Sequence, residues 1–348
     1  GKVGLSPALI GGKGTNYKYA VLDGATINVD GNIDKADSTS TSDSYIFTRR
    51  IQLQNTNINV LSGNTVKAHL NTTELTAINP NLSVPVGLDV SASGNSKNTT
   101  TTGVNVANGA TITVDRTDSG NGGVGAYVNY GTINNDGIIE VEKATPNDSA
   151  VGVYATNGTI VDNKTNGTIE VGGKDSIGIL GLSYRIDSKG NVVYEKFGTT
   201  GVSTEADKIG FVNITNSGKI TLDGENTLGI YTKNNSLDAT GSNIGYSRVG
   251  NSYTEATNKG EITMSGKNAI GMITEGGVAT NDTTGKITIS GQEGVAMYGT
   301  YAKGAALSGL TTDRLSAVLE NRGTIELADT TGITPIIGMF TNDADTTI

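Results

Sequence analysis

Apolar and polar residues alternate in a phrase that recurs along the chain. In the copy NSGKITLDGENTLGIY, which begins at Asn216, the apolar residues Ile220 and Leu222 alternate with polar neighbours. A period of two predicts a β-strand with one buried face. A turn rich in Gly and Asn follows, and a second short strand ends at Tyr231. Each copy therefore predicts two short strands joined by a corner.

The recurrence of the phrase predicts stacked coils, because strands this short cannot bury a core alone. Its leading isoleucines are spaced 25 to 51 residues apart, and the shortest spacing fits one coil of a three-sided β-helix. We expect about a dozen coils and a rod of very roughly 60 Å. A β-sandwich is the alternative, but it does not require a repeated phrase. The leading isoleucines are Ile139, Ile169, Ile220, Ile262, Ile287 and Ile325.

These patterns predict an all-β fold, a right-handed parallel β-helix (β-solenoid) with inserted loops and hairpins. The handedness follows from the general rule for parallel crossovers. We expect less regular coils over residues 1–104. Residues 105–348 carry the regular repeats of the same continuous solenoid.

Three insertions, 181–207, 232–256 and 299–319, interrupt the repeats. The first is expected to contain a hairpin that turns at Lys189–Asn191. The third carries a pattern that favours a short helix over residues 313–321.

Two turn residues of the phrase have a predicted structural role. Glycine at the corners supplies a positive φ or a close backbone approach without steric cost. The asparagine that opens each copy is expected to stack with its counterparts as a hydrogen-bonded ladder. The asparagines expected in this ladder are Asn166, Asn216, Asn258 and Asn321.

Composition narrows the function. A net charge of -9 argues against nucleic acid and anionic membranes as partners. No window approaches the 18 apolar residues of a membrane-spanning helix, and we expect no direct membrane insertion. The chain opens without a signal peptide and reads as a piece of a larger protein. The absence of cysteine excludes disulfides and thiolate metal sites, and it fits passage through an outer membrane in an unfolded state.

Catalytic chemistry is sparse, so we expect no enzyme, no catalytic residues, no metal site and no cofactor. His69 is the one histidine, and a lone histidine in an alternating strand favours a solvated or packed side chain. A polysaccharide-cleaving β-helix is the enzyme alternative, and it would need clustered acids in one groove. The acids look scattered, and many occupy outward positions where they favour solubility. They are Glu140, Glu170, Glu195, Glu225, Glu261 and Glu326.

Aromatic and arginine side chains gather in the three insertions, although the chain has only 13 Tyr and 4 Phe. Tyrosine offers a flat apolar face with a hydroxyl, and arginine can pair with a carboxylate, so both suit recognition. The alternative is that these side chains pack the insertions onto the solenoid. The candidate ligand-binding residues are Tyr184, Arg185, Tyr194, Phe197, Tyr246, Arg248, Tyr253, Tyr301 and Arg314.

The copies NGTIEVGGKDSIGIL and NSGKITLDGENTLGIY resemble repeats in the passenger regions of large type V autotransporter adhesins, particularly the giant fusobacterial adhesins of the arginine-inhibitable and galactose-binding types. The resemblance covers residues 105–348 well and residues 1–104 weakly. It implies a right-handed β-helix that is exported, anchored at the outer membrane through a barrel absent from this chain, and adhesive toward bacteria or host cells. The repeat marks scaffold, so it assigns no binding residue.

Our expectation is therefore a segment of a bacterial cell-surface adhesin. It would present binding loops to a bacterial or host-cell receptor, either protein or glycan. Three alternatives stay open: a structural spacer, a polysaccharide-cleaving β-helix, and self-association through stacked Asn, Thr and Asp faces.

Overall fold

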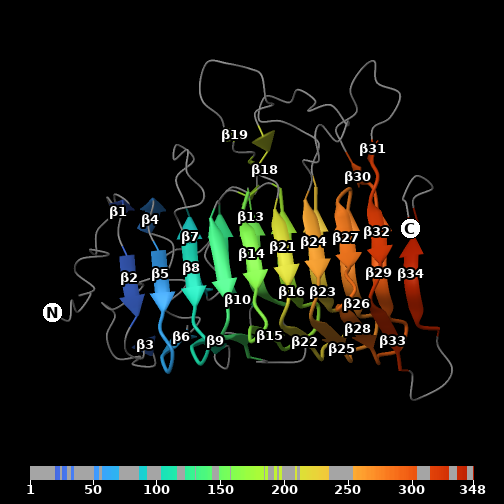
Figure 1. Cartoon of the computed structure of the whole chain (residues 1–348), viewed down its shortest axis with the longest axis horizontal. Coiled ribbons are helices and arrows are strands. Elements are labelled where there is room, and N and C mark those ends of the chain that lie inside the picture. The colour runs from blue at the N-terminus through green and yellow to red at the C-terminus, as the bar shows by residue number, and fades with distance from the viewer. Residues whose placement is uncertain are drawn as a thin grey trace.

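The computed structural model describes the strands of a rod and the corners between most of them. Strands follow one another along its length, and each pairs with its counterparts in the coils on either side (Figure 1). The described residues are 20–23, 26–29, 33–34, 51–54, 57–69, 86–91, 103–115, 122–129, 131–142, 149–156, 158–183, 185–186, 192–193, 196–197, 208–209, 212–234, 254–303, 314–328, 335–342 and 348.

Three parallel sheets form the rod, and each coil contributes one strand to every sheet except the last described coil, which contributes only a strand of the first sheet. Sheet A consists of β1 (Ala20–Asp23), β4 (Ile51–Gln54), β7 (Val86–Ser91), β10 (Gly123–Asn129), β13 (Ala150–Thr156), β16 (Ile177–Leu182), β23 (Leu228–Lys233), β26 (Ile270–Glu275), β29 (Val295–Thr300) and β34 (Ile337–Thr341). Sheet B consists of β2 (Thr26–Val29), β5 (Asn57–Val60), β8 (Gly103–Val106), β11 (Thr132–Asn135), β14 (Ile160–Asn163), β21 (Asn213–Asn216), β24 (Glu255–Asn258), β27 (Val278–Asn281) and β32 (Val318–Asn321). Sheet C consists of β3 (Ile33–Asp34), β6 (Thr65–His69), β9 (Thr111–Asp115), β12 (Ile138–Val141), β15 (Thr168–Val171), β22 (Lys219–Leu222), β25 (Glu261–Met264), β28 (Lys286–Ile289) and β33 (Thr324–Leu327).

The core is a stack of equivalent side chains, because each strand pairs in register with the strand one coil earlier. Ile220, Ile262 and Ile287 occupy consecutive places in sheet C, and all three are fully buried. The glycine of each Gly-Ile-Tyr phrase makes room for this stack. A Cβ on Gly229 would lie 2.8 Å from the Cγ2 of Ile262, so a larger residue would displace the core.

The solenoid prediction is confirmed, because parallel sheets wound coil on coil exclude an antiparallel sandwich. Right-handedness stays a prediction. Sheet A has ten strands among the described residues, compared with the dozen coils expected. At the usual strand spacing these ten strands span about 43 Å, compared with the expected length of very roughly 60 Å. Within the described part of the chain, the insertions lengthen several coils and so reduce the number of coils. The phrase also revealed only sheets C and A, since a sheet B strand such as β21 ends at the asparagine that opens the phrase.

The insertions contain short antiparallel pairs. β17 (Arg185–Ile186) pairs with β18 (Val192–Val193), which confirms the hairpin. The predicted helix over 313–321 is wrong: that segment contains β31 (Arg314–Leu315) and β32, because pairing with β27 and β30 overrides its helical pattern. The other short strands are β19 (Lys196–Phe197), β20 (Lys208–Ile209) and β30 (Ala302–Lys303).

A ladder of asparagines runs along the interior at the end of sheet B, buried in all its members except the last, Asn321, which is exposed. Each Nδ2 donates to the Oδ1 of the next asparagine, at 2.7–2.8 Å. The prediction that Asn166 belongs to the ladder is wrong. Asn163 takes its place, since the turn that follows contains two extra residues, and Asn166 instead donates to the Oδ1 of Asp136 at 3.1 Å. The ladder is Asn135, Asn163, Asn216, Asn258, Asn281 and Asn321.

Candidate binding surface on sheet B

The three outward faces of the rod differ in chemistry. Sheet C carries charge, with Lys286 and Glu326 on adjacent strands 2.6 Å apart and Lys219 and Glu261 3.8 Å apart. The contact between Lys286 and Glu326 raises the pKa of the Lys286 ammonium and lowers the pKa of the Glu326 carboxyl, mainly through their hydrogen bond. Sheet A carries apolar and aromatic rows, whereas sheet B carries amides, hydroxyls and a few charges.

On sheet B, four consecutive strands place an asparagine at the same outward position. The Nδ2 of Asn134 donates to the Oδ1 of Asn105 at 2.9 Å, Asn105 donates to Asn59 at 2.8 Å, and Asn59 donates to Asn28 at 2.9 Å. The side chains of Asn59, Asn105 and Asn134 are half-buried by their neighbours. This outer ladder holds the amide groups in fixed orientations along β2, β5, β8 and β11.

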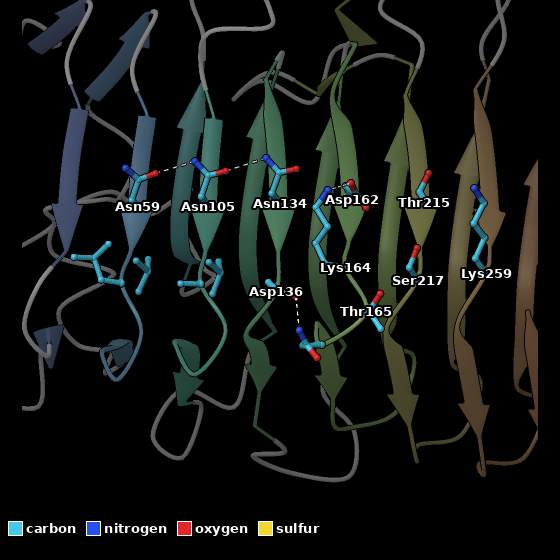
Figure 2. A pocket seen from close by; sticks show the side chains of 15 residues that line it. Asn59, Asn105, Asn134, Asp136, Asp162, Lys164, Thr165, Thr215, Ser217 and Lys259 are labelled. Atoms are coloured by element: carbon cyan, nitrogen blue, oxygen red, sulfur yellow. Dashed lines mark hydrogen bonds and ion pairs between the residues drawn. The ribbon is translucent and has the colours of Figure 1, made fainter. Parts of the chain in front are cut away.

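The outer ladder ends where Asp162 follows Asn134 in register. A carboxylate cannot donate to an amide oxygen. Among the described residues, the Oδ1 of Asn134 consequently has no hydrogen-bond donor. Figure 2 shows this oxygen directed toward the strand of Asp162. The Asp162 carboxylate accepts a hydrogen bond from the Lys164 ammonium, and the two side chains are 29% and 43% exposed.

A shallow depression of about 780 Å³ surrounds this position (Figure 2). Its floor consists of outward residues of β5, β8, β11, β14 and β21, and its rim comes from the turns that lead into sheet C. Two hydrogen-bond acceptors therefore lie beside an ammonium group in a solvent-open hollow. Such a set can accept hydrogen bonds from hydroxyl groups and donate one in return. The rim includes Asp136, Lys164, Thr165, Asn166, Ser217 and Lys259.

Sequence reasoning missed this surface because it concentrated on the repeat phrase. The available signal was an asparagine at the third position of successive strands, in TINV, NINV, GVNV and TINN. These strands lie mostly in the region of less regular coils, where the phrase is weak.

The insertion residues are placed only in part. Arg185, Phe197 and Arg314 lie in the short strands β17, β19 and β31. Tyr301 follows β29 and is half-buried. The remaining candidates, Tyr184, Tyr194, Tyr246, Arg248 and Tyr253, lie outside the described residues.

The interpretation that the acidic residues are scattered needs one correction. Glu140 and Glu170 are neighbours in register on sheet C, because the coil brings residues 30 positions apart side by side. Burial, followed by the charges of Glu142 and Glu170, raises the pKa of the Glu140 carboxyl. His69 closes strand β6.

Within the described ranges, no group of three or more His, Cys, Asp or Glu side chains is placed to hold a metal ion. No helix in that part of the chain has both the length and the hydropathy to span a bilayer. Comparisons with protein-family models, with curated proteins and with solved structures found no match.

Proposed function

We propose that this chain is a segment of a bacterial cell-surface adhesin, a β-helical stalk that presents loops and a polar face to a receptor on other bacteria or host cells. It would reach the surface by export and be held at the outer membrane by a barrel elsewhere in its parent protein. No cofactor or nucleic acid takes part in this function.

The placement of the insertions carries the proposal. All three connect sheet A to sheet B, between β16 and β21, β23 and β24, and β29 and β32. They therefore leave the rod at the same corner (Figure 1). A shared corner suits recognition, because insertions from successive coils can then meet a single partner. The strands extend up to two residues into the ranges expected for these insertions.

The depression on sheet B borders the other corner, where the strands turn into sheet C, and it supports a glycan as the receptor. A pair of neighbouring sugar hydroxyls could donate to the Asn134 Oδ1 and to the Asp162 carboxylate, while Lys164 donates to a sugar oxygen. Asp162→Asn tests this arrangement sharply, since the amide at this position would extend the outer ladder and donate a hydrogen bond to the unpartnered Oδ1 of Asn134.

The experiment is binding of the purified chain to bacterial and host cells, with free sugars and free amino acids as competitors. A natural template exists for removing an insertion: β26 and β27 are joined by Gly276 and Gly277 alone. Replacing 234–254 by Gly-Gly should keep the coil, and the same replacement applies to 183–212 and 301–317. Circular dichroism of each variant controls for folding.

We expect saturable binding that a competitor blocks, and a loss of at least about tenfold in affinity for one replacement or for Asp162→Asn. A folded chain that binds no cell would favour the structural spacer. Release of product from a glycan screen, abolished by Glu140→Gln, would favour the polysaccharide-cleaving alternative, because Glu140 and Glu170 are adjacent acids.

A further inference from the structure

The outward face of sheet A carries two apolar rows over seven consecutive strands, bordered on β23 and β26 by the ion pair of Lys233 and Glu275. Two rows of side chains cross β10, β13, β16, β23, β26, β29 and β34, and neither row contains a charged residue. The aliphatic row is Val124, Val151, Ile177, Leu228, Ile270, Val295 and Ile337. The aromatic row is Tyr127, Tyr154, Leu180, Tyr231, Ile273, Tyr298 and Phe340.

Both rows point outward, since the residues between them are buried. In β23, Gly229 and Ile230 face the core, whereas Leu228 and Tyr231 are half-buried on the surface. The last strand exposes its members further, with Ile337 at 37% and Phe340 at 44%. The two rows run along one side of the rod without interruption, and each strand bends between them, because two consecutive residues there face the core. Contiguous apolar surface of this extent marks an interaction site more often than a solvated face.

The aromatic row is ordered by ring contacts. Tyr127 and Tyr154 meet edge to face with centroids 5.2 Å apart, and Tyr298 stacks on Phe340 at 5.6 Å. The hydroxyl of Tyr231 donates to Glu275, whose carboxylate also pairs with Lys233 at 2.8 Å. The hydroxyl of Tyr231 is thereby directed to one border of the face, and the rings in contact form a pre-ordered surface. Rigid aromatic surfaces lose little entropy on association.

We propose that sheet A is the interface of a side-by-side homodimer, in which the apolar face of one copy packs on the same face of a second copy. Two sheets that face each other pack at a distance of about 10 Å. Seven strands at about 4.8 Å and about 20 Å of strand give roughly 600 Å² per copy, so a dimer buries roughly 1,200 Å². This total is at the lower end of the range of specific interfaces.

The two rows also favour a two-fold arrangement. A two-fold axis that lies in the interface, parallel to the rod and between the rows, places the aliphatic row of one copy against the aromatic row of the other. Smaller side chains then face larger ones, and each patch is used twice, as a closed dimer requires. Ile177 of one copy would face Leu180 of the other, since both belong to β16. Sheets B and C stay open in this dimer, so the association does not depend on the proposed adhesion.

Sedimentation equilibrium over a wide concentration range tests the proposal. We expect a monomer–dimer equilibrium that Leu180→Lys and Ile273→Lys each weaken by at least about tenfold, because each buries a charge in the interface. Thr221→Lys is the matched control: it adds the same charge on the exposed face of sheet C and should leave the equilibrium unchanged. Circular dichroism would show that all three variants keep the fold.

Cross-linking gives a second readout, because the chain has no cysteine of its own. Mixing the Ile177→Cys and Leu180→Cys chains should produce disulfide-linked dimers, whereas Thr221→Cys mixed with either should not. A monomer at every concentration overturns the proposal. An association that survives Leu180→Lys but is lost in Leu327→Lys also overturns it. Leu327 lies in β33, the last described strand of sheet C, so such an association would not use sheet A.

Discussion

Removal of one amide from the middle of the buried ladder should destabilise the rod more than any exposed substitution. Asn258 is fully buried; its Oδ1 accepts from the Nδ2 of Asn216 at 2.8 Å, and its Nδ2 donates to the Oδ1 of Asn281 at 2.8 Å. In Asn258→Ala the Asn281 oxygen has no donor among the described residues. Asn216 keeps only a longer contact to the carbonyl of Glu261, at 3.3 Å.

The magnitude follows from these contacts. A buried acceptor without a donor costs about 1–3 kcal/mol, and the lost amide also leaves a weakened donor and a small cavity. We expect the free energy of unfolding to fall by about 3–5 kcal/mol, a large part of what holds a domain together. Stacked coils couple only to their neighbours, so the transition can broaden as well as shift.

The assay is urea denaturation followed by circular dichroism, with Asn321→Ala as the matched control. Asn321 is exposed, and without it the Nδ2 of Asn281 still donates to the carbonyl of Thr324 at 3.2 Å. The control should therefore lose about 1 kcal/mol or less. Equal losses in the two variants, or a loss below about 1 kcal/mol for Asn258→Ala, would refute the reasoning, because the ladder would then contribute no more when buried than when exposed.

Two further substitutions test the corners and the charged face. Gly266→Ala should lower the stability by about 3 kcal/mol, because the new Cβ would lie 1.6 Å from a backbone carbonyl oxygen of the preceding coil. Gly338→Ala, which meets no atom within 4 Å, should melt close to the parent in a thermal scan, and similar shifts for both would contradict the steric argument. Glu140→Gln should stabilise the chain at pH 7. The raised pKa means that the folded state binds more protons than the unfolded state between the ordinary and the raised pKa, so stability falls as pH rises through that window. Melting temperatures of parent and variant should converge as the pH falls below the ordinary pKa of a glutamate, where Glu140 is protonated in both the folded and the unfolded state, and an unchanged difference would oppose this explanation.

The sequence predicted the elements that depend on local periodicity. The alternation around Ile220 and Ile262 identified the strands of sheet C, and their spacing identified the solenoid. What it could not supply was the pairing across long gaps. Asn166 directly precedes the Gly and Ile of its copy of the phrase, whereas Asn163 lies three residues earlier, and only the register of β14 against β21 selects Asn163 for the buried ladder.

The candidate surface shows the same limit. Asn134 and Asp162 are ordinary polar residues in the sequence, 28 positions apart, and only the fold makes them neighbours. Glu140 and Glu170 looked scattered for the same reason. The helix expected over 313–321 failed because its pattern is satisfied equally well by a strand once a neighbouring coil offers an edge for pairing.

The unequal lengths of the connections have a consequence for the order in which the coils assemble. Closing a coil brings together residues that are 23 positions apart at Asn258 and Asn281, but 53 apart at Asn163 and Asn216. Loop-closure entropy grows with the logarithm of that separation, so the longer closure is disfavoured by about 0.7 kcal/mol. Folding should therefore nucleate in the tightly connected coils near β24 to β29 and spread outward, and the coil that carries the longest insertion should join late. A kinetic intermediate of this kind would be ordered at β25 and β28 while the contact between β14 and β21 is still open.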